Sequence, residues 1–423
     1  MDRRQFISAT AAAGGLLLLK PRTVWSYQAN SAVRLGLLGC GSRGTTVATS
    51  FANNTNTRVV ALADLFPDQL DRGKAHFDEL ATSRSYPRID PKMMFRGHNA
   101  YQEIASCKDV DAVQISTPPY FHVQHLEAIV AAGKHVYCEK PMGVDVVHAK
   151  RALEIGKRAD GRMSLEVGFQ IRCAPPFVEL VRRIHDGALG KIGSIAAHYN
   201  SPASTYPDRP GISGDELRIR NWLWDRVLSG DIIVEQNIHV IDICNWILRG
   251  HPLKAFATGG RNIITHAGDT WDNYQVDYTY PDAVHVSFSS KQFGPEGWFD
   301  VSEGVFGSLG ISESPYSGPL HIVGQNAWEW SKEPAKDQTQ TATFAANGAF
   351  ADNLALADPE KEKSFIESIT SGKFHNQAAI GVESALSAML GRMAGRLGRE
   401  VTWDELLAKG EHFELNIDMN QFR

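Results

Sequence analysis

The chain has 423 residues, which is long enough for two domains with separate hydrophobic cores. Its hydrophobic content of 43% and charged content of 22% are ordinary for a soluble globular protein and exclude a fibrous or disordered chain. A net charge of −5 without a basic run argues against nucleic-acid binding, and five scattered cysteines without a CxxC pair argue against a disulfide framework or a cysteine zinc site.

The first 31 residues have the features of an export signal. Arg3-Arg4 precedes Phe6-Ile7 and an apolar stretch to Leu19, which is shorter than the roughly 20 residues of a spanning helix. This order resembles a twin-arginine (Tat) signal, with Ala29-Asn30-Ser31 as a weak cleavage candidate. We expect a periplasmic protein, anchored if the signal stays uncleaved; the alternative is an amphipathic N-terminus with a chance Arg-Arg pair.

The segment after the signal predicts a dinucleotide-binding unit. A buried-type strand at 33–38 leads into the GxGxxG sequence of Gly39–Gly44, a helix through Ala52 and a second strand at 58–63. The first glycine permits a tight turn, the second lets a pyrophosphate approach the backbone, and the third allows close helix–strand packing. Asp64, 20 positions beyond Gly44, can bind both ribose hydroxyls, which favours NAD over NADP.

Strands and helices continue to alternate along the chain. The patterns predict a helix at 67–80, short strands near 94–96, at 110–115 and at 135–138, and a helix at 121–132. This alternation is typical of a parallel, doubly wound sheet, whose ligands bind beyond the carboxyl ends of the strands. The loops at 116–122 and 139–141 follow two of those ends.

The patterns beyond residue 160 change to period two. A hairpin is predicted with strands at 276–280 and 284–288 around Pro281-Asp282, after a helix at 175–186. Further strand candidates lie at 192–199, 255–259, 305–312 and 321–324. Residues 333–355 are predicted to form a connector and residues 359–397 to form helices.

One stretch carries a specific resemblance. Ser116-Thr117-Pro118-Pro119, His122 and the run from Ala131 through Glu139-Lys140-Pro141 to Met142 closely resemble the Gfo/Idh/MocA oxidoreductases, a family that includes glucose–fructose oxidoreductase and inositol dehydrogenase. Segments 168–172, 187–192, 230–242 and 402–405 extend the similarity. The resemblance implies a second domain built on a large, mostly antiparallel sheet that faces the cofactor.

These observations define a domain plan. We predict a signal at 1–31, a Rossmann NAD-binding domain at 32–160, an α+β substrate and catalytic domain at 161–345, and C-terminal helices packing back on the core at 346–423. The residues predicted to bind NAD are Gly39, Gly41, Ser42, Arg43, Gly44, Asp64, Ser116, Thr117, Pro118, His122, Glu139 and Gln170.

Four residues are candidates for catalysis. The resemblance places Lys140 beside the nicotinamide and the reacting hydroxyl. Glu235, His239 and Asp242 are spaced to share one face of a predicted helix over 235–246, where a carboxylate can orient the imidazole as a general base or acid; the alternative is a structural histidine paired with its own acids. Many family members have Asp where this chain has Glu235. Arg172 and the aromatic Trp222 are candidate sugar contacts, although Trp222 also fits a core position.

Several functions remain open at this stage. The main expectation is an NAD(P)-dependent oxidoreductase acting on a sugar hydroxyl. The second is an NAD-dependent glycosidase using transient oxidation and elimination, because the run 235–239 is loosely similar to the Asn-Gln-Gly-x-His run of such enzymes. The third is a non-catalytic, cofactor-bound sugar-binding protein, and no catalytic metal is expected because His239-x-x-Asp242 is too sparse a ligand set. Expected partners are a carbohydrate, a membrane only through export, and a second copy of the chain through the second-domain sheet.

Overall fold

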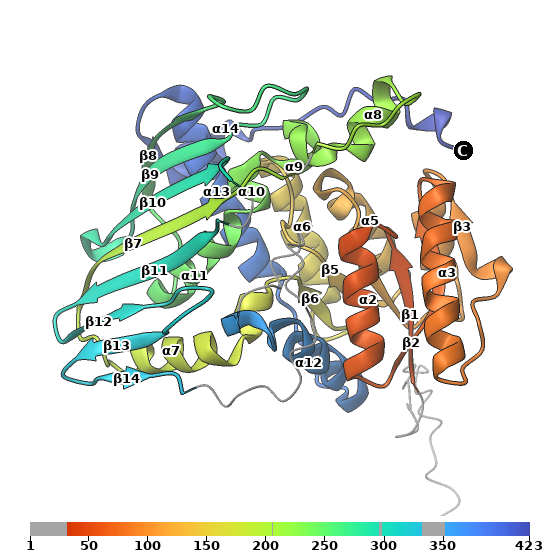
Figure 1. Ribbon diagram of the computed structural model, residues 1–423, viewed down its shortest axis with the longest axis horizontal. Coiled ribbons are helices and arrows are strands. Elements are labelled where there is room, and N and C mark those ends of the chain that lie inside the picture. The colour runs from red at the N-terminus through yellow and green to blue at the C-terminus, as the bar shows by residue number, and fades with distance from the viewer. Residues whose placement is uncertain (1–31, 205, 296–297, 332–351) are drawn as a thin grey trace, which may run out of the picture. The chain divides into compact units, whose positions relative to one another are not determined.

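The computed structural model describes residues 32–204, 206–295, 298–331 and 352–423. Residues 32–423 form one compact unit (Figure 1). The predicted signal segment at 1–31, the proposed boundary at 345/346 and most of the predicted connector lie outside the described residues. No helix in the described ranges combines the length and the apolar character that crossing a membrane requires.

A parallel sheet forms the N-terminal half. Its described strands lie in the order β3-β2-β1-β4-β5-β6, and every neighbouring pair is parallel. The chain order reverses between β1 and β4, so loops beyond these two strands diverge and leave a crevice for a ligand. The strands are β1 (Val33–Leu38), β2 (Thr57–Asp64), β3 (Met94–Arg96), β4 (Ala112–Ile115), β5 (His135–Cys138) and β6 (Leu165–Val167).

Helices cover both faces of this sheet, as its almost wholly buried strands require. They are α2 (Ser42–Asn54), α3 (Pro67–Ser83), α4 (Ala100–Ser106), α5 (His122–Ala131) and α6 (Val146–Ala159). The predicted doubly wound α/β unit is confirmed. Its last strand lies beyond residue 160, so the parallel sheet extends past the predicted boundary.

A second sheet forms the other half, in the described order β14-β13-β12-β11-β7-β10-β9-β8-β15. Only β7 and β10 pair in parallel among the described strands, so the expectation of a mostly antiparallel sheet is confirmed. The strands are β7 (Ile192–Ser201), β8 (Lys254–Gly260), β9 (Asn273–Thr279), β10 (His285–Gln292), β11 (Asp300–Gly307), β12 (Gly310–Glu313), β13 (His321–Gly324), β14 (Trp328–Glu329) and β15 (Val401–Thr402).

The sequence pattern missed one turn in this sheet. The strand predicted at 305–312 is wrong, because the chain reverses at Ser308-Leu309 and the two arms pair antiparallel as β11 and β12. Alternating apolar residues run through both arms and hide the turn. The hairpin around Pro281-Asp282, by contrast, is confirmed as β9 and β10.

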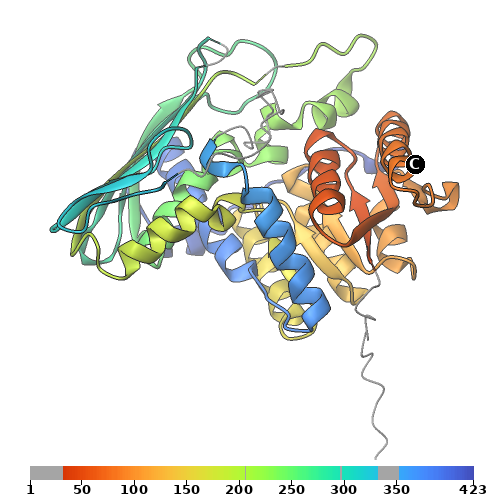
Figure 2. The same cartoon turned by 60° about the horizontal axis from the view of Figure 1, so that its bottom comes forward.

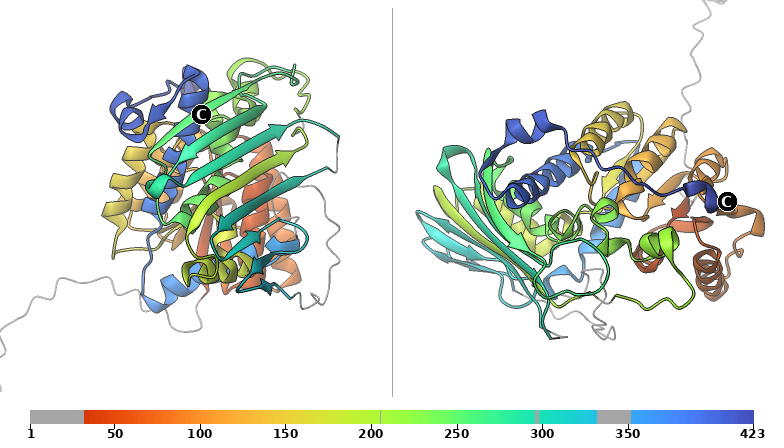
Figure 3. Two further views of the ribbon diagram at one scale, coloured as in Figure 1. Left: turned by 90° about the vertical axis from the view of Figure 1, so that its left-hand side faces the viewer. Right: turned by 90° about the horizontal axis from the view of Figure 1, so that it is seen from above.

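One face of the second sheet packs on helices (Figures 2 and 3). Its inward residues include Val276, Tyr278, Val286 and Phe288, each at most 3% exposed. The other face is turned to the viewer in the left-hand view of Figure 3 and carries exposed apolar side chains such as Phe256 and Phe306. The remaining helices are α7 (Pro175–His185), α8 (Gly214–Arg220), α9 (Arg226–Ser229), α10 (Ile232–Glu235), α11 (Ile238–Leu248), α12 (Ala357–Ser371), α13 (Ala378–Leu397) and α14 (Trp403–Lys409).

The helix predicted over 235–246 is not continuous. It is interrupted at Gln236-Asn237, with α10 before the break and α11 after it. Asp231 begins α10 from a positive φ of 76°, and the short α10 and longer α11 are separate segments. The expectation of one continuous helix is therefore wrong, although Glu235 and His239 still line the same cavity.

The C-terminal part of the chain returns to the parallel sheet. Helix α12 packs against α2, with the rings of Phe365 and Phe51 5.9 Å apart. After α14 the chain runs back along the molecule and ends near α3 and β3 (Figure 1 and the right-hand view of Figure 3). We call residues 411–422 the C-terminal strap.

Candidate active site

Two adjoining cavities lie at the carboxyl edge of the parallel sheet. The first, of about 200 Å³, is lined by Asp64, Phe66 and Pro118 among others. The second, of about 240 Å³, is lined by Lys140, Glu235 and His239 among others. Gly41, Ser116, Thr117 and Trp222 line both cavities. The arrangement suits an elongated ligand that passes over the glycine turn from one cavity to the other.

The glycine turn is shaped for close approach to its backbone. Gly39 has φ +97°, and a Cβ at Gly44 would lie 2.0 Å from the Gly39 carbonyl oxygen, so neither position tolerates a side chain. Gly41, in contrast, has nothing within 4 Å of a built Cβ and borders both cavities. The turn leads into the N-terminus of α2, whose free N–H groups favour a phosphate.

Asp64 ends β2 at the first cavity. Its Oδ2 accepts a hydrogen bond from the Cys40 N–H at 2.7 Å, and its Oδ1 accepts one from the Phe66 N–H at 2.9 Å. Burial raises the pKa of Asp64 to about 6, although these two backbone donors oppose the rise. The carboxylate is thus held beside the cavity, where its remaining lone pairs can accept ribose hydroxyls.

His122 ties the two predicted ligand loops together. Its Nε2 lies 2.8 Å from the Thr117 carbonyl oxygen and its Nδ1 lies 3.0 Å from the Pro141 carbonyl oxygen. The side chain is 1% exposed, and burial lowers its pKa. His122 borders the second cavity, but both ring nitrogens face backbone carbonyl oxygens, and the single N–H of the neutral ring donates to one of them.

Arg43, Glu139 and Gln170 also bind one another rather than standing free. The Arg43 Nε donates to Glu139 Oε1 at 2.9 Å, and its Nη2 donates to Gln170 Oε1 at 3.0 Å. The same guanidinium pairs with both carboxylate oxygens of Asp358, at 2.9 and 3.1 Å. All three of these predicted cofactor residues line the second cavity. We infer that they form its floor, with their polar groups bound mainly to one another and to Asp358.

Asp358 and Lys361 of α12 complete this network, and sequence reasoning missed both. Lys361 has a fully buried side chain and donates to Asp358 Oδ1 at 2.5 Å. Burial alone would raise the pKa of Asp358, but Arg43 and Lys361 hold it well below its usual range. No motif in the acid- and lysine-rich segment around Asp358 distinguishes it from a surface helix.

Lys140 and Glu235 form an ion pair inside the second cavity. The Lys140 Nζ lies 2.7 Å from Glu235 Oε1 and 2.5 Å from the Glu235 carbonyl oxygen. The two side chains are 12% and 11% exposed. The end of α10 therefore fixes the ammonium group through a carboxylate and a carbonyl at once, which leaves its third N–H for a ligand.

His239 lines the same cavity as this pair, and one of its ring nitrogens has no hydrogen-bond partner among the described residues. Its Nδ1 is buried and has no hydrogen-bond partner among the described residues, while the side chain borders the second cavity. Burial, and then the positive charges of Lys140 and Arg43, hold the pKa of His239 well below 6.5. The imidazole is therefore neutral at neutral pH and can accept a proton.

Asp242 does not orient His239, contrary to the expectation from their spacing. Its carboxylate accepts from Arg172 at 2.8 and 2.9 Å and from the Ser384 hydroxyl at 2.6 Å, and it is 1% exposed. Arg172 also packs over the Trp246 ring and borders neither cavity. The two residues pair with each other, and neither of them borders the two cavities.

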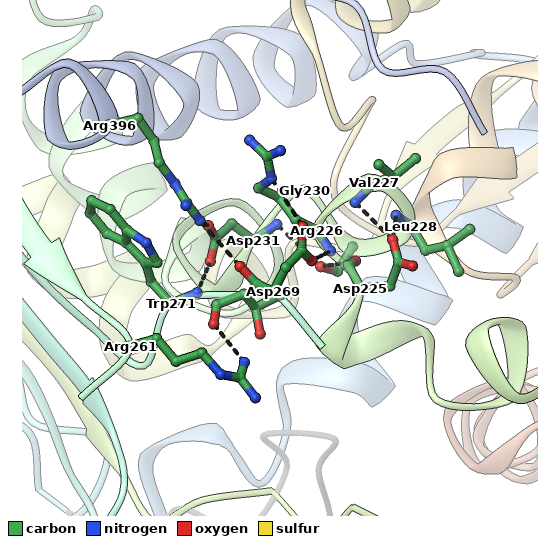
Figure 4. Close-up of polar contacts among 12 residues, drawn as sticks. Asp225, Arg226, Val227, Leu228, Gly230, Asp231, Arg261, Asp269, Trp271 and Arg396 are labelled. Atoms are coloured by element: carbon green, nitrogen blue, oxygen red, sulfur yellow. Dashed lines mark hydrogen bonds and ion pairs between the residues drawn. The ribbon is translucent and has the colours of Figure 1, made fainter. Parts of the chain in front are cut away.

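Hydrogen bonds to Asp225 and Asp231 hold the segment that leads into α10 (Figure 4). Asp225 caps α9 by accepting from the Val227 and Leu228 N–H groups. Asp231 accepts from the Ile232 and Trp271 N–H groups, both at 2.9 Å, and from Arg396 at 2.6 Å. These contacts secure the positive φ of Asp231 and so set where α10 begins.

Further residues line the second cavity without having been predicted. They include Tyr199 from β7, Leu223 beside Trp222, and Gln236, whose Oε1 accepts from Gln292 at 2.9 Å. Trp222 lies in the short 3₁₀ turn Trp222–Trp224 and borders both cavities. Tyr199, Leu223 and Gln236 reach the cavity only because the second sheet packs beside the parallel sheet, so no local sequence signal could have identified them.

Family models match both halves of the chain. Residues 33–167 match the model "Oxidoreductase family, NAD-binding Rossmann fold", and residues 177–313 match the "GFO/IDH/MocA C-terminal domain". Together the two ranges cover more than half of the chain. The matched segments contain the glycine turn, Asp64, Lys140, Glu235 and His239.

Curated relatives are similar over most of their length. An inositol 2-dehydrogenase of Rhizobium meliloti is 29% identical over 308 residues, which is 72% of this chain and 82% of the relative. A Salmonella typhimurium inositol 2-dehydrogenase is 25% identical over 287 residues, covering 67% and 74%.

Solved structures share the fold. A levoglucosan dehydrogenase in complex with NADH and levoglucosan aligns with a TM-score of 0.69 at 16% identity, covering 88% of this chain and 99% of that one. An aldose-aldose oxidoreductase from Caulobacter crescentus aligns with a TM-score of 0.66 at 19% identity, covering 88% and 99%.

Proposed function

Because this chain belongs to the GFO/IDH/MocA oxidoreductase family, we propose that it oxidises one ring hydroxyl of a cyclic polyol or sugar with NAD⁺ as the hydride acceptor. One observation carries the proposal above all others. Lys140, held by Glu235, and the neutral His239 line a cavity that shares Gly41 with the cofactor turn. The relatives named inositol 2-dehydrogenase support a cyclic polyol as the substrate class.

The residues of the first cavity fit NAD. The open approach to Gly41 and the N-terminus of α2 suit a pyrophosphate, and Asp64 suits the two hydroxyls of a ribose. A 2′-phosphate beside the Asp64 carboxylate would be repelled, which favours NAD over NADP. When bound, NAD⁺ supplies the hydride acceptor.

Two side chains act on the reacting hydroxyl, one by accepting its proton and the other by stabilising the charge on its oxygen. His239 is neutral and borders the cavity, so it accepts the proton of the reacting hydroxyl. The third N–H of Lys140, which the two contacts with Glu235 leave available, would donate to the same oxygen and stabilise the negative charge that develops there. Glu235 is a positioning residue, because it acts through the ammonium group it holds.

The substrate class is tested on protein purified without added nucleotide. Any bound dinucleotide is released by denaturation and identified, and the intact protein is screened with NAD⁺ against cyclic polyols, free sugars and an aryl glycoside. We expect NADH formation with a cyclic polyol or sugar. Phenol release from the glycoside without net NADH would support the glycosidase instead, and a protein without affinity for NAD would overturn the proposal.

Asp64 gives a pH-dependent prediction for NAD affinity. A carboxyl with a pKa of about 6 is protonated as the pH falls through 6, and its protonated oxygen can no longer accept from both the backbone and a ribose. We expect NAD binding to weaken below pH 6, and Asp64→Asn to weaken it at pH 7.5 by about 10–100-fold, as for a lost hydrogen bond to a charged group.

Calorimetric titration of NAD between pH 5 and 8 checks this prediction. Asp71→Asn, which changes an exposed acid of α3, is the matched control and should behave as the unchanged protein does. A dissociation constant that does not vary with pH in the unchanged protein would assign Asp64 a structural role only.

We also propose that the protein works in the periplasm after export through the Tat pathway. The order Arg3-Arg4, Phe6-Ile7 and an apolar stretch to Leu19 supports this location. Cell fractionation of the unchanged chain and of an Arg3→Lys/Arg4→Lys variant tests it. Equal periplasmic amounts of the two proteins would contradict twin-arginine export.

A further inference from the structure

A buried carboxylate lies where helix α6 begins, outside both cavities. Asp145 is fully buried, and its Oδ1 caps α6 by accepting from the His148 N–H at 2.7 Å. Its Oδ2 accepts from the Phe413 N–H at 2.7 Å, which joins the helix start to the C-terminal strap.

Two imidazoles converge on the same carboxylate oxygen. The Nδ1 atom of His148 lies 2.8 Å from Asp145 Oδ2, and the Nδ1 atom of His412 lies 3.4 Å from it. The three ligand atoms all lie within 4.8 Å of one another. In the described part of the chain, this is the one group of three His, Cys, Asp or Glu side chains with such spacing.

We propose that Asp145, His148 and His412 bind a divalent transition-metal ion of the Zn²⁺ class. Two imidazoles and a carboxylate are ligands that Zn²⁺ accepts, with metal–ligand distances near 2.0–2.2 Å. Tetrahedral ligands at such distances lie roughly 3.3 Å apart. The distance between His412 Nδ1 and Asp145 Oδ2, 3.4 Å, fits this spacing. The distance between His148 Nδ1 and Asp145 Oδ2, 2.8 Å, must increase by only about 0.5 Å to match it.

The surroundings leave a path for an ion and a place for a fourth ligand. The His412 side chain is 40% exposed, whereas Asp145 is buried, so the metal would be held at the surface by an interior anchor. Glu414 lies 3.4 Å from the Nε2 atom of His412, and the Tyr120 ring packs edge-on against the His148 ring. Water can complete the coordination, and Glu414 is placed to accept from the Nε2–H of His412 on the far side of the ring from the metal.

The proposed ion would fasten the C-terminal strap. His412 is near the beginning of the strap, and the next residue, Phe413, already binds Asp145. Near its end, Met419 borders the first cavity and Phe422 packs on Phe66, with ring centres 5.9 Å apart. The His98 N–H also donates to the Phe422 carbonyl oxygen at 2.9 Å. A metal at one end therefore restricts a segment whose other end borders the cavity proposed for NAD.

The site is tested by titrating Zn²⁺ into the full chain after treatment with a chelator. We expect one equivalent to bind in the calorimeter, and both His412→Ala and His148→Ala to weaken binding at least about 10–100-fold, the loss seen even for outer-shell changes. His198→Ala is the matched control, because it removes a histidine paired with a carboxylate, Asp300, at 2.9 Å on the second sheet. This control should bind Zn²⁺ as the unchanged protein does.

Hydrogen exchange supplies a second readout that does not depend on catalysis or on NAD. We expect Zn²⁺ to slow amide exchange in residues 411–422 of the unchanged protein and of His198→Ala, but not of His412→Ala. Absence of stoichiometric binding, or equal affinities in the unchanged protein, His148→Ala and His412→Ala, would overturn the site. Binding without slower exchange in the strap would overturn the fastening.

Discussion

Lys140→Met is expected to lower kcat by about 10²–10³-fold, the loss typical of removing one donor that stabilises developing negative charge, while NAD still binds. The Lys140 ammonium lies in the substrate cavity and is fixed by the carboxylate and carbonyl of Glu235. Methionine keeps a similar length but has no charge and no N–H to offer the reacting oxygen. Steady-state kinetics and NAD titration on the same preparation measure the two effects separately.

The control for this substitution is Lys157→Met. Lys157 lies on α6 with a side chain 63% exposed and pairs with Glu154 at the surface. It should leave kcat and NAD affinity unchanged. Full turnover by Lys140→Met would contradict the assignment of Lys140 to the reaction.

Asp358→Asn is expected to destabilise the protein by about 3–5 kcal/mol, the usual cost of removing one partner from a buried ion pair. Asp358 is the shared partner of Arg43 and of the fully buried Lys361. Asparagine has nearly the same shape but no charge, so Lys361 and Arg43 both lose the Asp358 carboxylate, and within the described residues only Arg43 keeps another, that of Glu139. Urea unfolding monitored by circular dichroism gives the free-energy change.

The same network predicts how the stability of the protein changes with pH. Arg43 and Lys361 hold the pKa of Asp358 below its unfolded value, so its contribution to stability is present above about pH 4 and is lost as the pH falls further. Glu360→Gln is the matched control, because Glu360 pairs with Lys363 at the surface with a side chain 41% exposed. A stability loss no greater for Asp358→Asn than for Glu360→Gln would show that the buried network contributes little.

Local patterns were enough to predict the parallel sheet and its cofactor turn. Each element there is specified by neighbours in sequence: an apolar strand, the glycines at 39, 41 and 44, and an acid at the end of the next strand. The period-two alternation likewise predicted most strands of the second sheet, because one face of that sheet is buried.

The site was predicted less completely because it is assembled by long-range contacts. Arg43 meets Asp358, and Lys140 meets Glu235, only once the two halves have folded together. The helical spacing of 235, 239 and 242 was misleading, because the break at Gln236-Asn237 and the Arg172–Asp242 pair depend on tertiary contacts. Sequence motifs could therefore indicate Lys140 and His239 as candidates, but they could not show which carboxylates contact these two side chains.

The most direct test of the proposed reaction follows the hydrogen itself. A substrate found in the screen is labelled with deuterium at the carbon that carries the reacting hydroxyl and mixed with the protein and NAD⁺ for a single turnover. Mass spectrometry of the released dinucleotide should show one deuterium on the nicotinamide ring, and a parallel reaction with Lys140→Met should show almost none in the same time. Substrate conversion without deuterium on the nicotinamide would contradict hydride transfer to NAD⁺ and with it the proposed function.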